Sequence, residues 1–189
     1  ALLLPGLLLS VWQVGTGLRR SPVKGVSVSG MQVALAALFM VAFMGVWMAH
    51  GFAGMMFPLP RLTWLTGHLT LALLGWVGTL LMAVSLKLVP MFYLSPELPE
   101  LLAARLLRVH VAGLLCVTLV PWLAWSGAIS ASTAALLLAA AAAPAAVTVW
   151  GLHPAWVLVS LARRRRKRAD PSCRYWQVAM SVAPAVGLL

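Results

Sequence analysis

The chain has 189 residues, of which 62% are hydrophobic and only 9% are charged, and its mean hydropathy is +0.98. A soluble globular domain is nearer to half apolar and about a quarter charged, so these proportions exclude that class. Two cysteines do not make a disulfide scaffold, and the apolar composition excludes a disordered chain. We expect an all-α, polytopic transmembrane helical bundle, in which the basic residues behind the net charge of +11 set the orientation.

Uncharged stretches mark the predicted spans. A helix crosses the roughly 30 Å hydrocarbon core of a bilayer with about 20 apolar residues. The chain offers about six such stretches, at residues 1–18, 31–50, 62–92, 101–125, 132–162 and from 176 onwards, the last of them truncated. None alternates with period two, and backbone groups in lipid must be satisfied within a segment, which favours helices. Because the sequence begins without Met and stops inside an apolar run, we expect residues 1–189 to form a single transmembrane domain, a segment of a longer polytopic protein.

The basic residues predict how these spans are oriented. With the connection after the first span placed inside, thirteen of the 14 Lys and Arg fall on that side, and only Arg61 falls on the other. This asymmetry follows the positive-inside rule. It predicts a multi-pass protein of a bacterial-type inner (plasma) membrane, with loop 163–174 in the cytoplasm. Trp64, Trp122 and Trp125 then fall at the outer boundary, as in an aromatic belt.

The basic run at residues 163–168 is most simply a topology determinant, and a site for anionic lipid headgroups is the functional alternative. Because the run lies against the membrane between two predicted spans, we expect no nucleic-acid partner. The expected partners are the lipid bilayer and either an electron-transfer partner or other membrane subunits.

Familiar catalytic and metal-binding patterns are absent from the sequence. No Asp or Glu lies inside a predicted span, and no Walker loop, dinucleotide fingerprint, HExxH or nucleophile elbow is present. Cys116 and Cys173 lie at different predicted depths without CxxC spacing. Met55 and Met56, near His50, are soft donors that suit copper, although methionine more often serves packing. The metal ligands therefore stay unknown, and the sequence does not decide whether the chain is an enzyme.

Four histidines remain as candidates, and their predicted depth sorts them. His50 and His68 lie at similar height near the outer surface, because a short loop joins their spans. His110 and His153 lie toward the inner ends of the fourth and fifth spans. At about 1.5 Å per residue, His68 and His110 are more than roughly 20 Å apart along the membrane normal, too far to be the axial ligands of one haem. His50 with His68 could be such a pair, and so could His110 with His153.

His68 has the most informative neighbours on its own helix. With 3.6 residues per turn, Gly75, Thr79 and Leu86 project within about 20° of it. A glycine beneath a histidine leaves room for a flat macrocycle, and equally for a neighbouring helix. We therefore name His68, and after it His50, as candidate cofactor-binding residues. The plainer alternatives are that His68 packs against another helix and that His50 faces water.

Residues 68–92 resemble the second helix of the haem–copper oxidase catalytic subunit (subunit I), nearest its nitric oxide reductase-like or uncharacterised relatives. In that helix a histidine near the outer surface ligates the low-spin haem, and small residues, a Trp and a Leu-Val-Pro follow it. His68, Gly75-Trp76, Gly78 and Leu88-Val89-Pro90 fall in matching positions. The resemblance implies an integral membrane protein that binds a low-spin haem through His68 for electron transfer.

The resemblance does not imply oxygen or nitric oxide reduction. The family's copper-site histidines are absent, and His153-Pro154 continues as Ala-Trp where the family has a glutamate. The family's second low-spin ligand comes from a much later helix. Two other classes stay open. A transporter or channel would explain a fifth helix broken around Pro144, Gly151 and Pro154, and a structural or assembly subunit would need no cofactor.

Overall fold

The computed structural model describes residues 3–54, 61–165 and 171–187, and this part of the chain is helical and contains no strand. In chain order its elements are α1 (Leu3–Arg20), α2 (Val26–Phe52), α3 (Arg61–Thr70), η1 (Leu71–Gly78), α4 (Thr79–Tyr93), α5 (Glu100–Trp125), α6 (Ala131–Ala146), η2 (Val147–Leu152), α7 (His153–Ala162) and α8 (Pro171–Val186). The η elements are π-helical and join the α-helices on either side. Residues 61–93 and 131–162 are therefore two continuous helices.

Four of these helices are long and apolar enough to cross a membrane. They are Val26–Phe52, Arg61–Tyr93, Glu100–Trp125 and Ala131–Ala162, which match the predicted stretches 31–50, 62–92, 101–125 and 132–162. The prediction of an all-α membrane bundle is thus confirmed for four spans, but not for six. Helices form at the other two places, yet α1 includes Gln13 and ends in two arginines, and α8 has only 16 residues.

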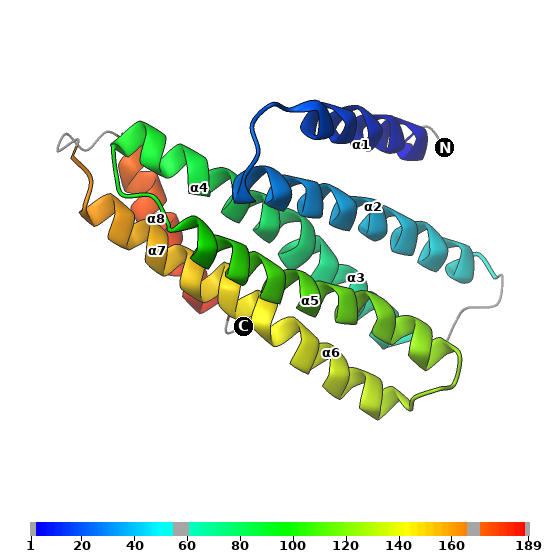
Figure 1. Cartoon of the computed structure of the whole chain (residues 1–189). Coiled ribbons are helices and arrows are strands. Elements are labelled where there is room, and N and C mark those ends of the chain that lie inside the picture. The colour runs from blue at the N-terminus through cyan, green and yellow to red at the C-terminus, as the bar shows by residue number, and fades with distance from the viewer. Residues whose placement is uncertain (1–2, 55–60, 166–170, 188–189) are drawn as a thin grey trace.

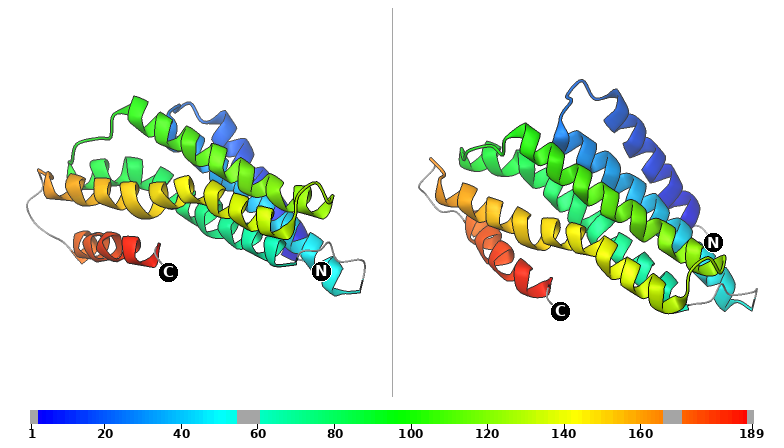
Figure 2. Two further views of the ribbon diagram at one scale, coloured as in Figure 1. Left: turned by 90° about the horizontal axis from the view of Figure 1, so that it is seen from below. Right: turned by 60° about the horizontal axis from the view of Figure 1, so that its bottom comes forward.

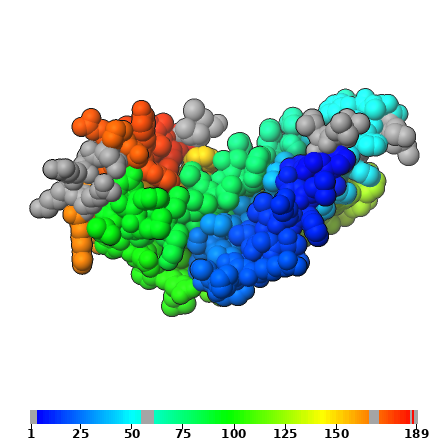
Figure 3. Space-filling model, turned by 90° about the horizontal axis from the view of Figure 1, so that it is seen from above, coloured from blue at the N-terminus to red at the C-terminus, as the bar shows by residue number. Residues whose placement is uncertain are grey.

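Successive helices run in alternating directions and pack side by side (Figures 1 and 2). The connections 21–25, 94–99 and 163–165 lie toward one end, which we call the basic end, and the connection 126–130 lies at the opposite end. Helix α1 packs along α2 at the edge of the bundle (Figure 3), and α8 packs against α7. The four candidate spans therefore form the body of the bundle, and the two shorter helices flank it.

Two apolar clusters fill the interior. The larger joins α2, α3, η1, α5, α6 and η2 through residues such as Met44, Trp64, Val117 and Leu138, all of them almost wholly buried. The smaller joins α4, α7 and α8 and contains Cys173. Lipid tails are as apolar as these side chains, so close packing rather than escape from water holds such helices together.

Small residues bring the helices into close contact. At Gly113 of α5, an added Cβ would lie 2.6 Å from the carbonyl oxygen of Ala141 on α6. At Gly30 of α2, it would lie 2.7 Å from the Cβ of Ala83 on α4. Any larger side chain at these glycines would force the helices apart. The alanine-rich stretch of α6 thus serves as a contact surface for α5.

The two π-helical segments lie next to each other in the bundle. An added Cβ on Gly78, at the end of η1, would lie 2.7 Å from Cγ1 of Val149 in η2. The helix 131–162 is continuous through Pro144 and Pro154, so it is not divided into two helices, but it departs from α-helical geometry between these prolines, at η2. π-Helical turns are rare and occur often at functional sites.

The Gly113 contact gives a first prediction. Gly113→Ala should lower the free energy of unfolding of the chain in detergent by about 1–3 kcal/mol, because the new methyl group overpacks the α5–α6 contact. Gly151→Ala is the matched control, since no atom lies within 4 Å of the position of its Cβ. Thermal or denaturant unfolding of both variants measures the difference, and equal stabilities would contradict the close approach of α5 and α6.

Candidate functional site

His68 lies on α3 and its ring faces α2. Its side chain is half-buried, and an added Cβ on Gly45 of α2 would lie 3.3 Å from its Cε1 atom. The Nδ1 atom is buried and has no hydrogen-bond partner among the described residues. The backbone of Val41 on α2 lies nearby, but no hydrogen bond of good geometry joins it to the ring. A buried imidazole nitrogen without a partner is exceptional and calls for an explanation.

Two tryptophans near His68 also have a buried nitrogen without a hydrogen-bond partner. Trp64 lies one turn before His68 on α3, and its indole Nε1 is buried without an acceptor. Trp47 of α2 lies two residues after Gly45, and its Nε1 is likewise buried and unpaired. The rings of Trp47 and Trp64 are 6.3 Å apart between centroids. We call these three atoms, Nδ1 of His68 and Nε1 of Trp47 and Trp64, the nitrogen cluster.

Further aromatic rings surround the two tryptophans. Trp122 of α5 meets Trp64 edge to face with centroids 4.7 Å apart, and Trp125 lies 5.7 Å from both Trp47 and Trp122. The sequence predicted Trp64, Trp122 and Trp125 as a boundary belt. In the structure Trp64 is wholly buried against its neighbours, while Trp125 is exposed. The N–H groups of buried indoles usually find an acceptor, which makes the unpaired pair here unusual.

The space below His68 is filled by neighbouring helices. An added Cβ on Gly75 would lie 3.1 Å from the Cβ of Ala37 on α2 and 3.5 Å from Leu114 on α5. Thr79 is wholly buried and directed at α5. Of the two alternatives for Gly75, a macrocycle or a helix, the structure has the helix. A π-helix bonds residue i to i+5 and takes more residues per turn, so η1 also turns Thr79 away from the face that carries His68.

His50 is exposed near the end of α2, and its Nδ1 lies 3.0 Å from the carbonyl oxygen of Val46 in the same helix. No hydrogen bond or ring contact within the described residues joins it to His68. The two candidate ligands thus belong to adjacent helices, and only His68 is part of a packed environment.

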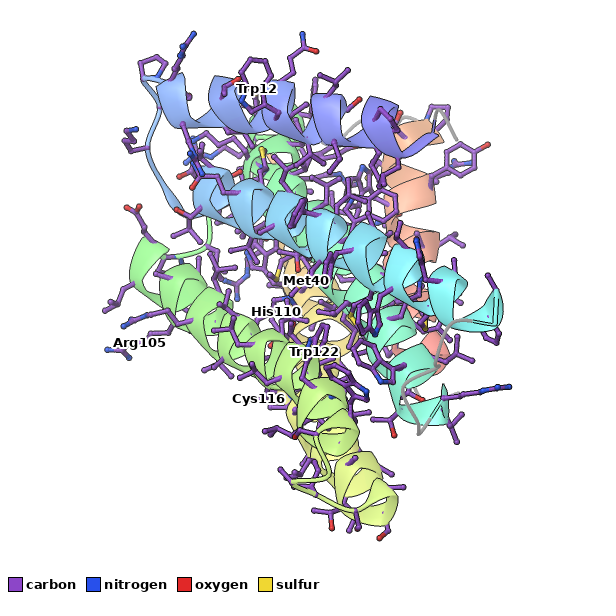
Figure 4. All side chains as sticks on the ribbon, turned by 90° about the vertical axis from the view of Figure 1, so that its right-hand side faces the viewer. Trp12, Met40, Arg105, His110, Cys116 and Trp122 are labelled. Atoms are coloured by element: carbon purple, nitrogen blue, oxygen red, sulfur yellow. The ribbon has the colours of Figure 1, made fainter. Side chains whose placement is uncertain are left out.

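His110 forms a buried hydrogen bond between helices. Its Nε2 lies 2.6 Å from Oγ1 of Thr79, and the same oxygen lies 2.9 Å from the carbonyl oxygen of Leu74. The Thr79 hydroxyl thus lies within hydrogen-bond distance of both the imidazole and a backbone carbonyl, and which group donates in the imidazole contact depends on the tautomer of His110. Figure 4 shows His110 directed into the bundle and Arg105, on the same helix, directed away from it.

His153 repeats this arrangement nearer the basic end. Its Nε2 lies 2.6 Å from Oγ of Ser85, and that hydroxyl donates to the carbonyl of Met82 at 2.9 Å. Thr79 and Ser85 are six residues apart on the helix 61–93, about 9 Å along its axis. The Thr79 hydroxyl is hydrogen-bonded to α5, and the Ser85 hydroxyl is hydrogen-bonded to the helix 131–162. Sequence reasoning named both histidines but missed both hydroxyl partners, since nothing in the pattern pairs residues 31 or 68 positions apart.

No group of three or more His, Cys, Asp or Glu side chains within the described ranges could hold a metal ion. Cys116 is exposed on α5 and Cys173 is buried on α8. Met55 and Met56, considered above as soft donors, lie outside the described residues.

Comparisons with protein-family models, with curated proteins and with solved structures gave no match to this chain.

The interhelical pair gives a second prediction. Thr79→Val keeps the side-chain shape but removes the hydroxyl that pairs with His110, and should lower the free energy of unfolding by about 1–2 kcal/mol. Thr118→Val is the control, because the Thr118 hydroxyl bonds only the Leu114 carbonyl of its own helix. Thermal unfolding in detergent compares the two. Should Thr79→Val be as stable as Thr118→Val, the buried pair does not hold the helices together.

Proposed function

We propose that the chain is an electron-transfer domain of a multi-pass membrane protein and that it binds haem through His68. The observation that carries the proposal is the nitrogen cluster, three buried nitrogen atoms without partners on adjoining faces of α2 and α3. Ionisable and polar groups buried at membrane depth are commonly functional. The resemblance of residues 68–92 to the haem-ligating helix of the oxidase subunit is a second, independent support.

The chemistry of the cluster suits haem in two respects. A neutral imidazole is a common axial ligand of haem iron, and two indole N–H groups are hydrogen-bond donors for the carboxylate side chains of the macrocycle. Haem, when bound, supplies a one-electron redox centre. His50 is the candidate within this chain for a second axial ligand, which a low-spin iron requires.

The fit has a clear limit at Gly75. Ala37 and Leu114 occupy the space beside it, so a macrocycle cannot lie there unless α2 and α5 move apart. The residues proposed to hold the group are therefore His68, Trp47 and Trp64, and Gly75 and Thr79 are left out. The transporter alternative rested on a fifth helix broken around Pro144, Gly151 and Pro154, and the helix 131–162 is continuous but π-helical there.

Spectroscopy of the purified full chain tests the proposal. We expect a Soret band after expression with haem available, and His68→Ala should abolish it or shift it grossly because the iron loses a ligand. Thr66→Ala, an exposed change two residues away on the same helix, should leave it intact. If His50→Ala also changes the low-spin bands, His50 is the second ligand.

Two outcomes would contradict haem binding. A wild-type protein without haem, purified from cells that load a control cytochrome, would favour a structural or assembly subunit. Equal haem content in His68→Ala and wild type would remove His68 as a ligand even if haem is present.

We further propose that the basic end of the bundle faces the cytoplasm, in the inner membrane of a bacterial-type cell. The support is the charge asymmetry, since thirteen of the 14 Lys and Arg belong to the connections predicted on this side or to the helix segments next to them. Loop 163–174 lies at this end, although its residues 166–170 are outside the described ranges.

Labelling from outside intact cells tests this orientation. Native Cys173 is a poor reporter because it is wholly buried, so a new cysteine is needed at each end. In a Cys116→Ala background, Glu97→Cys at the basic end should resist an impermeant thiol reagent, and Ser132→Cys at the opposite end should react. Both positions are exposed in the folded chain. The reverse pattern would overturn the proposed topology.

A further inference from the structure

An apolar chamber of about 200 Å³ lies inside the bundle toward the basic end. Helices α2, α4, α5 and the helix 131–162 surround it. Its wall includes Gly30, Met82, Leu102, Leu107, Leu152 and Trp156. Close contact of Gly30 with Ala83 draws α2 against α4 and closes one side of it.

The chamber has no side-chain polar group in its wall that is left free to bind a water molecule. Its polar side chains are Thr148 and His153, and both have partners elsewhere. Thr148 donates to the carbonyl of Pro144 at 2.7 Å, and His153 is bonded to Ser85. An engineered apolar cavity of about 150 Å³ stays dry and binds benzene, and this chamber is larger. Its natural occupant is an apolar group.

A second hollow of about 400 Å³ adjoins the chamber at the basic end. The two share Val26, Leu86, Leu98 and Ala103 in their walls. The second hollow also contains four charged side chains, from Lys24, Lys87, Glu97 and Glu100. We call it the charged mouth.

The charges of the mouth are balanced and accessible. Lys87 and Glu97 form an ion pair of 3.8 Å in which the two side chains are 64% and 69% exposed. Exposed pairs of this kind are weak, so a ligand with both charges can replace them at little cost. Lys24 and Glu97 lie in connections at the basic end, Glu100 begins α5, and Lys87 lies six residues before the end of α4. A lysine this close to a helix end can extend its ammonium group toward the headgroup region.

We propose that the chamber and the mouth together bind one zwitterionic phospholipid with an ethanolamine headgroup. The phosphate contacts Lys24 and Lys87, the ammonium group donates hydrogen bonds to Glu97 and Glu100, and an acyl chain enters the chamber past Leu86. An anionic lipid satisfies the lysines but leaves the two glutamates facing net negative charge. The site therefore selects phosphatidylethanolamine over phosphatidylglycerol of the same chain length.

Native mass spectrometry of the full chain, purified in detergent and offered equal amounts of the two lipids, tests the proposal. We expect one tightly retained lipid, with phosphatidylethanolamine favoured several-fold. Leu86→Trp fills the passage between mouth and chamber and should reduce that retention by about tenfold. Leu119→Trp, at a position on α5 that is 58% exposed, is the control and should retain the lipid as wild type does.

A second arm tests the headgroup. The double variant Glu97→Gln, Glu100→Gln keeps the chamber but removes the partners of the ammonium group, and should reverse the preference toward phosphatidylglycerol. Unfolding temperature and elution volume check that each variant is folded, and Leu98→Trp replaces Leu86→Trp if the latter is not. Equal retention of both lipids by wild type would overturn headgroup selection. Full retention in a folded chamber-filling variant would show that the lipid lies elsewhere. Neither outcome bears on haem binding, which is measured separately.

Discussion

Absence of water is the constraint on which the rest of this structure depends. A backbone that crosses hydrocarbon has to pair its own N–H and C=O groups, and helices do so within one segment. The same rule applies to side chains, because a polar group without a partner is costly in an apolar medium. The bundle obeys it at the Nε2 atoms of His110 and His153, where two hydroxyls are the partners, but not at Nδ1 of His110, which is buried without one. It also breaks the rule at the nitrogen cluster, and that exception is what directs attention to His68.

The buried hydroxyls have a second effect, on the charge of the interior. Each lies within hydrogen-bond distance of one backbone carbonyl and of one imidazole Nε2, so a single hydroxyl contacts two helices. The interior of the spans lacks a carboxylate to balance an imidazolium. The polar contacts are thus neutral throughout, which makes them suited to joining helices.

The sequence predicted the parts of the fold that depend on hydropathy. Uncharged runs identified the four long helices to within a few residues. The close contacts between them, such as that of Gly113 with α6, became visible only in the structure. The sequence also predicted a span at residues 1–18. The helix that forms there, α1, is not among the four candidate spans, because glycine and polar side chains interrupt its apolar residues. His68 was found from its depth and its neighbours, but Trp47 was not, because its relation to His68 exists only once α2 and α3 pack. Thr79 was placed on the wrong face, since a constant 3.6-residue period does not hold through η1.

The meeting of η1 and η2 at Gly78 and Val149 has a geometric consequence. Two of the four long helices depart from α-helical geometry where they touch, and a π-helical turn holds more residues than an α-helical one. The faces of each helix are therefore rotated on one side of this level relative to the other. Trp64 and His68 precede it on the helix 61–93, and Ser85 and the residues of that helix that line the chamber follow it.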